Sequence, residues 1–332
     1  MKRTCIAVAL VLGLWLPGAA HALETVRITN IGHGYWAGPL FVAQRLGLFE
    51  KHGLKAEVTT VKGGSLSLQT ALTKQADVAQ VTFEHVLKAA SRGKRVVSIY
   101  RFAKVPNNSL LANNKIADRV KGASVADRVR ALKGARVGVP SAGGSGEKML
   151  QVLAHKYGLQ LPGDVQTVYL GADPGAYVAA FKRDQIDAAM MFEPTGTFLK
   201  QAHLGTTLVD LIRGEEPMFS DVLFLTLTTH PDIIKEKPDT LRKIAAVYDE
   251  ALNILHNDPA RGKALMAKEF PNLTPETNAS TYDAMAATWA KNGHMDVGQA
   301  KRTMAYMSSL GGLNLPANFD PSPYFSNDLL PK

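Results

Sequence analysis

Short apolar runs and longer segments with helical spacing alternate along two stretches of the chain, residues 26–83 and 135–193. In both stretches the predicted order is strand, glycine-rich loop, helix and strand. The predicted ranges are, for the first copy, 26–31, 32–38, a helix ending near 52–54, and 57–61, and for the second copy 135–139, 141–146, a helix ending at 156–159, and 165–170. This alternation predicts parallel sheets covered by helices, and the repeat predicts two similar lobes.

Both copies continue into a helix and then end alike. An acidic residue, Asp77 or Asp187, precedes a short apolar strand, and the two positions are 187 − 77 = 110 residues apart. The exits also correspond, with Thr82-Phe83-Glu84 in one copy and Met191-Phe192-Glu193 in the other. Two similar α/β lobes in one chain predict a cleft between them, and small ligands bind in such clefts.

Two connectors rich in turn-forming residues, 104–109 and 213–217, predict where the chain crosses between the lobes. The last strand before the first crossing is expected at 95–102, a new strand at 110–112, and an apolar run follows the second crossing at 222–228. We therefore expect residues 23–106 together with 218–332 in lobe 1, and residues 107–217 in lobe 2.

The rest of the chain has the pattern of helices. Thr274 is a predicted N-cap with Pro275 at the first helical position. Asp296 and Gln299 have the spacing of a capping box, and the pair 311–312 of glycines is a predicted helix stop. We expect these helices to cover the outside of lobe 1 and to serve core packing.

The N-terminus has the pattern of a secretory signal peptide. Lys2 and Arg3 precede an apolar run at 6–16, and residues 20–22 form an A-x-A cleavage site. The apolar run is shorter than the roughly 20 residues of a transmembrane helix. Cys5 precedes the run, whereas a lipoprotein cysteine would follow it. We therefore expect residues 1–22 to be removed and the protein to reach the periplasm without a lipid anchor.

Composition limits the chemistry of the mature chain. Cys5 is the only cysteine, so cleavage would leave no thiol for disulfides or for nucleophilic catalysis. Removal of two of the 38 basic residues leaves 36 against 29 acidic ones, a net charge of +7. The basic residues are scattered, which argues against a nucleic-acid footprint but permits a mild attraction for anions.

Each glycine-rich loop lies between a strand and a helix, where unpaired backbone amides and the helix dipole can hold an anion. In the first loop Tyr35 and Trp36 add surface for stacking, and in the second Ser145 could cap the helix or donate to a ligand. The alternative is that these glycines only permit tight turns. The glycines concerned are Gly32, Gly34 and Gly38 in the first loop and Gly143, Gly144 and Gly146 in the second.

Searches for catalytic motifs are mostly negative. Residues 32–38 form G-x-G-x-x-x-G, but no acidic residue ends the following strand, as a dinucleotide site requires. The Walker spacing and the G-x-S-x-G nucleophile elbow are both missing. The histidines have neither H-E-x-x-H nor H-x-H spacing. We therefore expect a protein that is not an enzyme and that has no metal site and no cofactor.

Several polar residues are candidates for the walls of the predicted cleft. Arg101, near the first crossing, could pair either with Glu193 or with an anionic ligand. Phe83 and Phe192 either belong to the core or stack on a ligand. The polar candidates are Ser65, Thr82, Glu84, Arg101, Ser141 and Glu193.

Four segments resemble the nitrate/sulfonate/taurine (NMT1/THI5-like) branch of the periplasmic substrate-binding proteins of ABC importers. They are GYWAGPLFVAQRLGLFEKHGLKAEV (34–58), ALTKQADVAQ (71–80), LKGARVGVPSAGGSGEKMLQVLAHKYGL (132–159) and AAFKRDQIDAAMMFEP (179–194). The resemblance covers nearly the whole mature chain. It implies an α/β, two-lobed type II periplasmic binding protein fold, in which each lobe is a mixed sheet flanked by helices.

The resemblance also implies which residues face the ligand: Tyr35, Trp36, Gly64, Ser65, Thr82, Phe83, Ser141, Gly144, Ser145 and Glu193. The sequence departs from the family pattern at two places. Phe192 stands where relatives often have tryptophan, and the pair Phe83-Glu84 stands where many relatives have small residues. A carboxylate in the cleft would repel a simple inorganic anion.

The function that the resemblance implies is capture of a small organic solute, anionic by expectation (sulfonate- or taurine-like, or an aromatic carboxylate), for an ABC permease in the inner membrane. We expect a monomer. Two alternatives stay open: a binding protein for the pyrimidine precursor of thiamine, and a ligand-sensing partner of a membrane receptor. The cysteine-rich segment of the related pyrimidine synthases is missing here.

Overall fold

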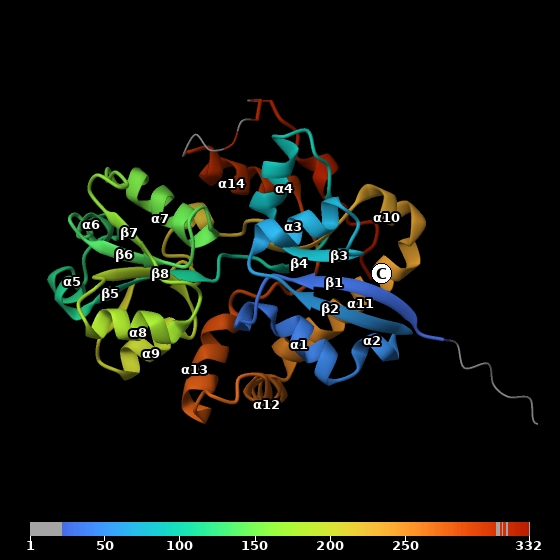
Figure 1. Cartoon of the computed structure of the whole chain (residues 1–332), viewed down its shortest axis with the longest axis horizontal. Coiled ribbons are helices and arrows are strands. Elements are labelled where there is room, and N and C mark those ends of the chain that lie inside the picture. The colour runs from blue at the N-terminus through green and yellow to red at the C-terminus, as the bar shows by residue number, and fades with distance from the viewer. Residues whose placement is uncertain (1–21, 310–312, 314, 317, 332) are drawn as a thin grey trace, which may run out of the picture.

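The protein consists of two five-stranded mixed sheets with helices on their faces, as the computed structural model in Figure 1 shows for residues 22–309, 313, 315–316 and 318–331. The first sheet has the order β2-β1-β3-β10-β4 and the second β7-β6-β8-β5-β9. The strands are β1 (Glu24–Asn30), β2 (Leu54–Thr60), β3 (Val78–Thr82), β4 (Val97–Ala103), β5 (Asn108–Asn113), β6 (Arg136–Val139), β7 (Gln166–Tyr169), β8 (Ala188–Phe192), β9 (Gly205–Val209) and β10 (Leu225–Thr229).

The two sheets define the lobes. The first sheet, in lobe 1, takes its strands from 24–103 and 225–229, and the second, in lobe 2, from 108–209. The lobe limits expected near 106 and 217 stay predictions, and the predicted signal peptide lies outside the described residues apart from Ala22. Within the described chain, none of the helices combines the length and apolar character that a membrane span requires.

The predicted two-lobed α/β fold with mixed sheets is confirmed; the alternation of strands and helices indicated parallel strands, and one strand of each sheet is antiparallel to its neighbours. β1 is parallel to β2 and β3, whereas β10 is antiparallel to β3 and β4. In lobe 2, β5 is antiparallel to β8 and β9. The antiparallel strands β5 and β10 are the first strands after the two crossings. The chain therefore enters each sheet from the other lobe, in the opposite direction to the βα repeat.

The internal repeat is present in atomic detail. Asp77, just before β3, accepts hydrogen bonds from the backbone N, Nε and Nη2 of Arg27 at 2.9, 3.2 and 2.9 Å. Asp187, just before β8, accepts the same three bonds from Arg136 at 2.9, 3.0 and 3.1 Å. Each aspartate thus joins the first strand of its repeat to the central strand. Both carboxylates have a lowered pKa because the paired arginine favours the charged form over the cost of burial.

The helices follow the predicted order with one break. The first helix was expected to run to residues 52–54, but it is divided at Gly47, which adopts a left-handed φ of 63° that favours glycine. The helices are α1 (Gly38–Arg45), α2 (Leu48–Lys51), α3 (Gly64–Leu72), α4 (Phe83–Ala90), α5 (Asn114–Arg119), α6 (Val125–Arg130), α7 (Ser145–Lys156), α8 (Pro174–Lys182), α9 (Thr195–Gln201), α10 (Pro231–Glu236), α11 (Pro238–Asn257), α12 (Pro259–Glu269), α13 (Pro275–Ala286) and α14 (Val297–Ser308), with short 3-10 turns η1 (Tyr35–Ala37), η2 (Pro217–Phe219) and η3 (Ser322–Tyr324).

The C-terminal helices begin as predicted but extend beyond lobe 1. Thr274 caps α13, and Asp296 with Gln299 forms the capping box of α14. However, α13 packs on α9 of lobe 2 and α14 packs on α7 (Figure 1). The side-chain amide of Gln201 in α9 bonds the hydroxyl of Thr277 in α13 at 2.8 and 3.0 Å. The C-terminal helices therefore pack on lobe 1, as expected, and two of them also contact lobe 2. The predicted stop at 311–312 lies outside the described residues.

Candidate functional site

The lobes touch at the carboxyl ends of their parallel strands. From lobe 1, the indole of Trp36 in η1 meets the ring of Phe192 at the end of β8, with centroids 4.5 Å apart and planes at 75°. From lobe 2, the hydroxyl of Ser145 at the start of α7 donates to Glu84 Oε1 in α4 at 2.6 Å. Both contacts join residues that sequence analysis singled out, one from each lobe. This boundary, termed here the lobe junction, is the candidate site.

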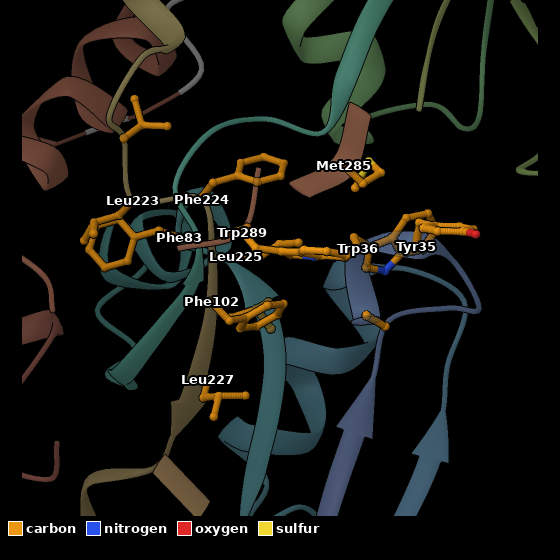
Figure 2. Close-up of a cluster of buried hydrophobic side chains, with 14 of the residues drawn as sticks. Tyr35, Trp36, Phe83, Phe102, Leu223, Phe224, Leu225, Leu227, Met285 and Trp289 are labelled. Atoms are coloured by element: carbon orange, nitrogen blue, oxygen red, sulfur yellow. The ribbon is translucent and has the colours of Figure 1, made fainter. Parts of the chain in front are cut away.

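The first glycine-rich loop presents Trp36 to the junction. A Cβ on Gly34 would lie 2.0 Å from the indole ring, so only glycine leaves room for the ring in this position. Trp36 is 8% exposed, and its Nε1 has no hydrogen-bond partner among the residues that the structure describes. Figure 2 shows Trp289 on the lobe 1 side of Trp36, and a Cβ on Gly38 would lie 2.6 Å from the Trp289 ring.

Tyr35 is held away from the junction. Its ring stacks on Phe270 at 4.6 Å between centroids, and its hydroxyl bonds Asn278 of α13. Burial raises the pKa of Tyr35. Of the two aromatic residues in this loop, Trp36 reaches lobe 2 and Tyr35 fixes the loop to the C-terminal helices.

Several polar side chains at the start of α4 lie close to the hydrogen bond between Ser145 and Glu84. Glu84 is 1% exposed and stands 3.6 Å from the ring of His85, whose Nδ1 is 2.7 Å from Thr82 Oγ1. Burial lowers the pKa of His85 despite the neighbouring carboxylate. A Cβ on Gly64 would lie 2.7 Å from the same ring, so glycine is needed for the close approach of that loop. Ser65, beside it, is exposed.

Phe83 belongs to the core, which was one of its two predicted roles. It is fully buried beside Leu223 and Phe224, as Figure 2 shows, and its amide donates to the Phe224 carbonyl at 2.8 Å. Because this packing fixes the first residue of α4, it positions the neighbouring Glu84.

The second glycine-rich loop is braced by Glu147. Its carboxylate accepts from the Gly143 amide and from the Tyr169 hydroxyl, both at 2.6 Å. Gly144 is the N-cap of α7 and has no side-chain cap bond. Ser145 does not cap α7, because its hydroxyl points to Glu84 instead. Ser141 is exposed, and its carbonyl accepts from the Gly144 amide at 3.3 Å.

The remaining lobe 2 wall runs from α7 to β8. A Cβ on Gly146 would lie 3.6 Å from the Asn108 side-chain nitrogen, and Asn108 pairs with Phe192 in the register of β5 and β8. Residues of both lobes are thus linked by contacts at the junction, and they are termed here the ring residues: Trp36, the loops at Gly32 and Gly64, His85, Glu84, Ser145, Gly146, Asn108 and Phe192. Both lobes therefore contribute side chains to one candidate site.

The two predicted charged residues near Phe192 and the first crossing have their own partners. Glu193 accepts from the Thr197 amide and hydroxyl at 3.0 and 2.9 Å, and burial raises the pKa of this carboxyl. Arg101 binds Asp221 at 3.2 Å, beside the second crossing. The alternative that Arg101 pairs with Glu193 is thus wrong. Burial lowers the pKa of Arg101 in spite of Asp221.

Three residues of this region escaped sequence analysis as ligand candidates. His85 was considered only for metal spacing, although its position directly after Glu84 was a usable signal. Asn108 was assigned to a connector, but it begins β5. Thr195, at the start of α9, is fully buried with an unpartnered hydroxyl.

A separate cavity of about 550 Å³ lies between α8 and α9 of lobe 2. It is mainly apolar and includes none of the ring residues, so the contacts across the lobes define the candidate site better. Its lining residues are Gly175, Val178, Ala179, Lys182, Phe198, Gln201 and Ala202.

This chain is similar to known proteins over most of its length. A binding protein of Brucella abortus (strain 2308) is 29% identical over 270 residues, which cover 80% of this chain and 78% of the relative. A solved protein from Bordetella bronchiseptica RB50 superposes with a TM-score of 0.77 at 21% identity, over 92% of this chain and 95% of its own.

The fold is shared more widely. The alkanesulfonate-binding protein SsuA from Xanthomonas axonopodis pv. citri, bound to MOPS, has a TM-score of 0.70 at 17% identity over 91% of this chain and 98% of its own. The desulfurization enzyme DSZB has a TM-score of 0.62 at 14% identity over 92% and 97%. All three structural likenesses, at 21%, 17% and 14% identity, concern the fold alone. The family model described as "NMT1/THI5 like" matches residues 37–262, and the chain belongs to this family.

Proposed function

We propose that this NMT1/THI5-like protein is the solute-binding component of an ABC importer and captures a small organic solute at the lobe junction. The observation that carries the proposal is the pair of contacts across the lobes, Trp36 with Phe192 and Ser145 with Glu84. Residues of both lobes meet around one point, so a solute bound there would contact both and favour the closed form. The permease would recognise that form.

The physical requirement is modest. A micromolar complex needs about 8 kcal/mol, which a few hydrogen bonds in a dry site and one or two aromatic contacts can supply. The unpartnered Trp36 Nε1 and Thr195 Oγ1 are buried donors that a solute could satisfy. All twelve residues expected to face the ligand stay predictions; Trp36, Glu84 and Ser145 have the strongest geometric support.

The solute class and the cell compartment are finer parts of the proposal. A sulfonate-, taurine- or nitrate-like anion or an aromatic carboxylate is supported by the name of SsuA and by the uncapped start of α7. We also propose export to the periplasm, release without a lipid anchor, and action as a monomer beside an inner-membrane permease.

A second candidate is a binding protein for a flat nitrogen heterocycle such as the pyrimidine precursor of thiamine. The aromatic pair Trp36 and Phe192 favours a flat ligand. A ligand-sensing role would use the same site, and stimulation of a reconstituted permease by the loaded protein would separate transport from sensing. An enzyme is the remaining class, and turnover of a co-purified solute would reveal it.

The central experiment is native mass spectrometry of freshly isolated protein, followed by small-angle scattering with and without the molecule that it carries. We expect one small molecule per chain and a smaller radius of gyration when it is bound. A single rigid shape that is unchanged by every compound in a transport-substrate panel would refute solute capture between the lobes.

A further inference from the structure

Two carboxyl groups lie in the segments that meet at the lobe junction. Glu84 is 1% exposed and lies in the first turn of α4. Glu193, which follows Phe192, is partly buried, and burial raises the pKa of its carboxyl. Arg101 binds Asp221, and its buried Nε has no hydrogen-bond partner among the described residues; Lys148, one turn along α7, bonds Gln151 at 3.2 Å.

The other groups around Glu84 are hydroxyls, an imidazole and one lysine a turn further along α4. His85 has a pKa lowered by burial and by Lys88, the next cation along α4. From α14, the hydroxyl of Tyr306 is fully buried without a partner, and burial together with the charge of Glu84 raises its pKa. The described surroundings of Glu84 thus supply hydroxyl and imidazole groups but no paired cation.

We propose that Glu84 selects the solute, and that the solute presents a positively charged N–H group to it, as an organic amine or amidine does. The inference rests on the proposed function and names the solute class of that same site. It takes from the proposed function only the capture of a solute by both lobes, and it replaces the anionic solute class that was named there and expected from the family resemblance.

Three features of the junction fit such a cation. A carboxylate can accept about four hydrogen bonds, and Glu84 accepts only that of Ser145 among the bonds of the described residues. The Trp36 and Phe192 rings stand edge to face at 4.5 Å, and aromatic faces attract organic cations. The buried, unpartnered Trp36 Nε1 can donate to an acceptor elsewhere on the same molecule.

The same residues disfavour an anionic solute. At the start of α7 it would compete with Glu84 for the Ser145 hydroxyl. Two like charges about 4 Å apart in a protein environment lower affinity by about a thousandfold relative to a neutral neighbour. The Ser145 hydroxyl at the start of α7 is therefore already bonded to the protein's own carboxylate.

The test uses two probes of similar size and opposite charge, benzamidine and benzenesulfonate, titrated calorimetrically at pH 7 and low salt. We expect the parent protein to bind benzamidine at least about tenfold more tightly than benzenesulfonate. Glu84→Gln should weaken benzamidine binding by about tenfold or more and strengthen benzenesulfonate binding. Glu50→Gln, an exposed carboxylate in α2, is the matched control and should change neither.

Two outcomes separate the hypotheses. If the parent protein prefers benzenesulfonate, or if Glu84→Gln weakens the binding of benzenesulfonate, selection by charge is refuted while solute capture by the lobes stands. If neither probe binds and scattering detects no closure with any compound, the proposed function is refuted together with the inference. Circular dichroism of each variant confirms that it is folded.

Discussion

Replacing Ser145 by alanine should open the two lobes, because it removes the hydrogen bond that joins them at Glu84. The bond is 2.6 Å long, and the acceptor is a carboxylate that is 1% exposed. Bonds to charged groups contribute about 1.5–3 kcal/mol. Water solvates Glu84 when the lobes part, so the lower end applies. A loss of about 1.5 kcal/mol lowers the ratio of closed to open protein by about tenfold.

The predicted mature chain contains no cysteine, so cysteines introduced for labelling would be the ones that react with the dyes. Cysteines placed at the exposed positions Lys55 in lobe 1 and Lys121 in lobe 2 can carry a donor and an acceptor dye. Single-molecule energy transfer then counts closed and open molecules. Small-angle scattering of the unlabelled variant gives an independent radius of gyration, which should increase.

A matched control removes the same chemistry from within one lobe. Ser124 caps α6 and its hydroxyl bonds Asp127 at 2.7 Å, both inside lobe 2. Ser124→Ala should cost about 1 kcal/mol of stability and leave the dye distances unchanged. Equal distance distributions for the parent and Ser145→Ala would refute the idea that this bond holds the lobes together.

Three further predictions concern the scaffold and the aromatic contact. Asp77→Asn should lower the free energy of unfolding by about 3 kcal/mol, because this 1% exposed carboxylate also binds Lys237 at 2.9 Å. Asp187→Asn, at a 26% exposed carboxylate, should lower it by only about 1 kcal/mol. Urea titrations measure both values, and equal losses would contradict this prediction. Because the pKa of Asp77 is lowered in the folded protein, Asp77 contributes to folding stability above the ordinary aspartate pKa, and this contribution is lost as the pH falls through the pKa of the folded state. The stability of Asp77→Asn should therefore be less sensitive to acid than that of the parent. Thermal melts between pH 2 and 7 measure this difference. Gly34→Ala should displace the Trp36 ring, and both it and Trp36→Ala should weaken binding of the co-purified solute by tenfold or more. Trp36→Ala should also lower the free energy of unfolding by about 3–5 kcal/mol, because the side chain is buried. Unchanged calorimetric affinities would place the site elsewhere.

Local signals predicted the parts of the fold that depend on local physics. Glycine-rich loops after strands, the caps at Thr274 and Asp296, and the aspartates 110 residues apart all lie where the pattern indicated. The partners of those aspartates, Arg27 and Arg136, were not singled out, although both stand at corresponding places in the first strand of each repeat. A search for paired charges at equal offsets in the two copies would have found them.

Strand direction and the placement of the last helices depend on the path between lobes. A strand that follows a crossing, such as β10, has the same composition whether it runs parallel or antiparallel to its neighbours. The period of α13 indicates one apolar face, but not which lobe provides the opposing surface. Gln201 and Thr277 are 76 residues apart, and no pattern in either segment indicates their contact.

Charge partners at the junction were the hardest to predict, and they decide the chemistry of the site. From the sequence, Arg101 was available to an anionic solute and Glu84 was an unexplained departure from the family pattern. In the fold, Arg101 is held by Asp221, and Asp221 also accepts from Gln299 at 3.1 Å and binds Arg302. This network holds one end of the Arg101 guanidinium at the crossing between the lobes. Glu84 is then the charged group aimed across the junction, so the sign of the solute's charge follows from one residue's partners rather than from the net positive charge of the chain.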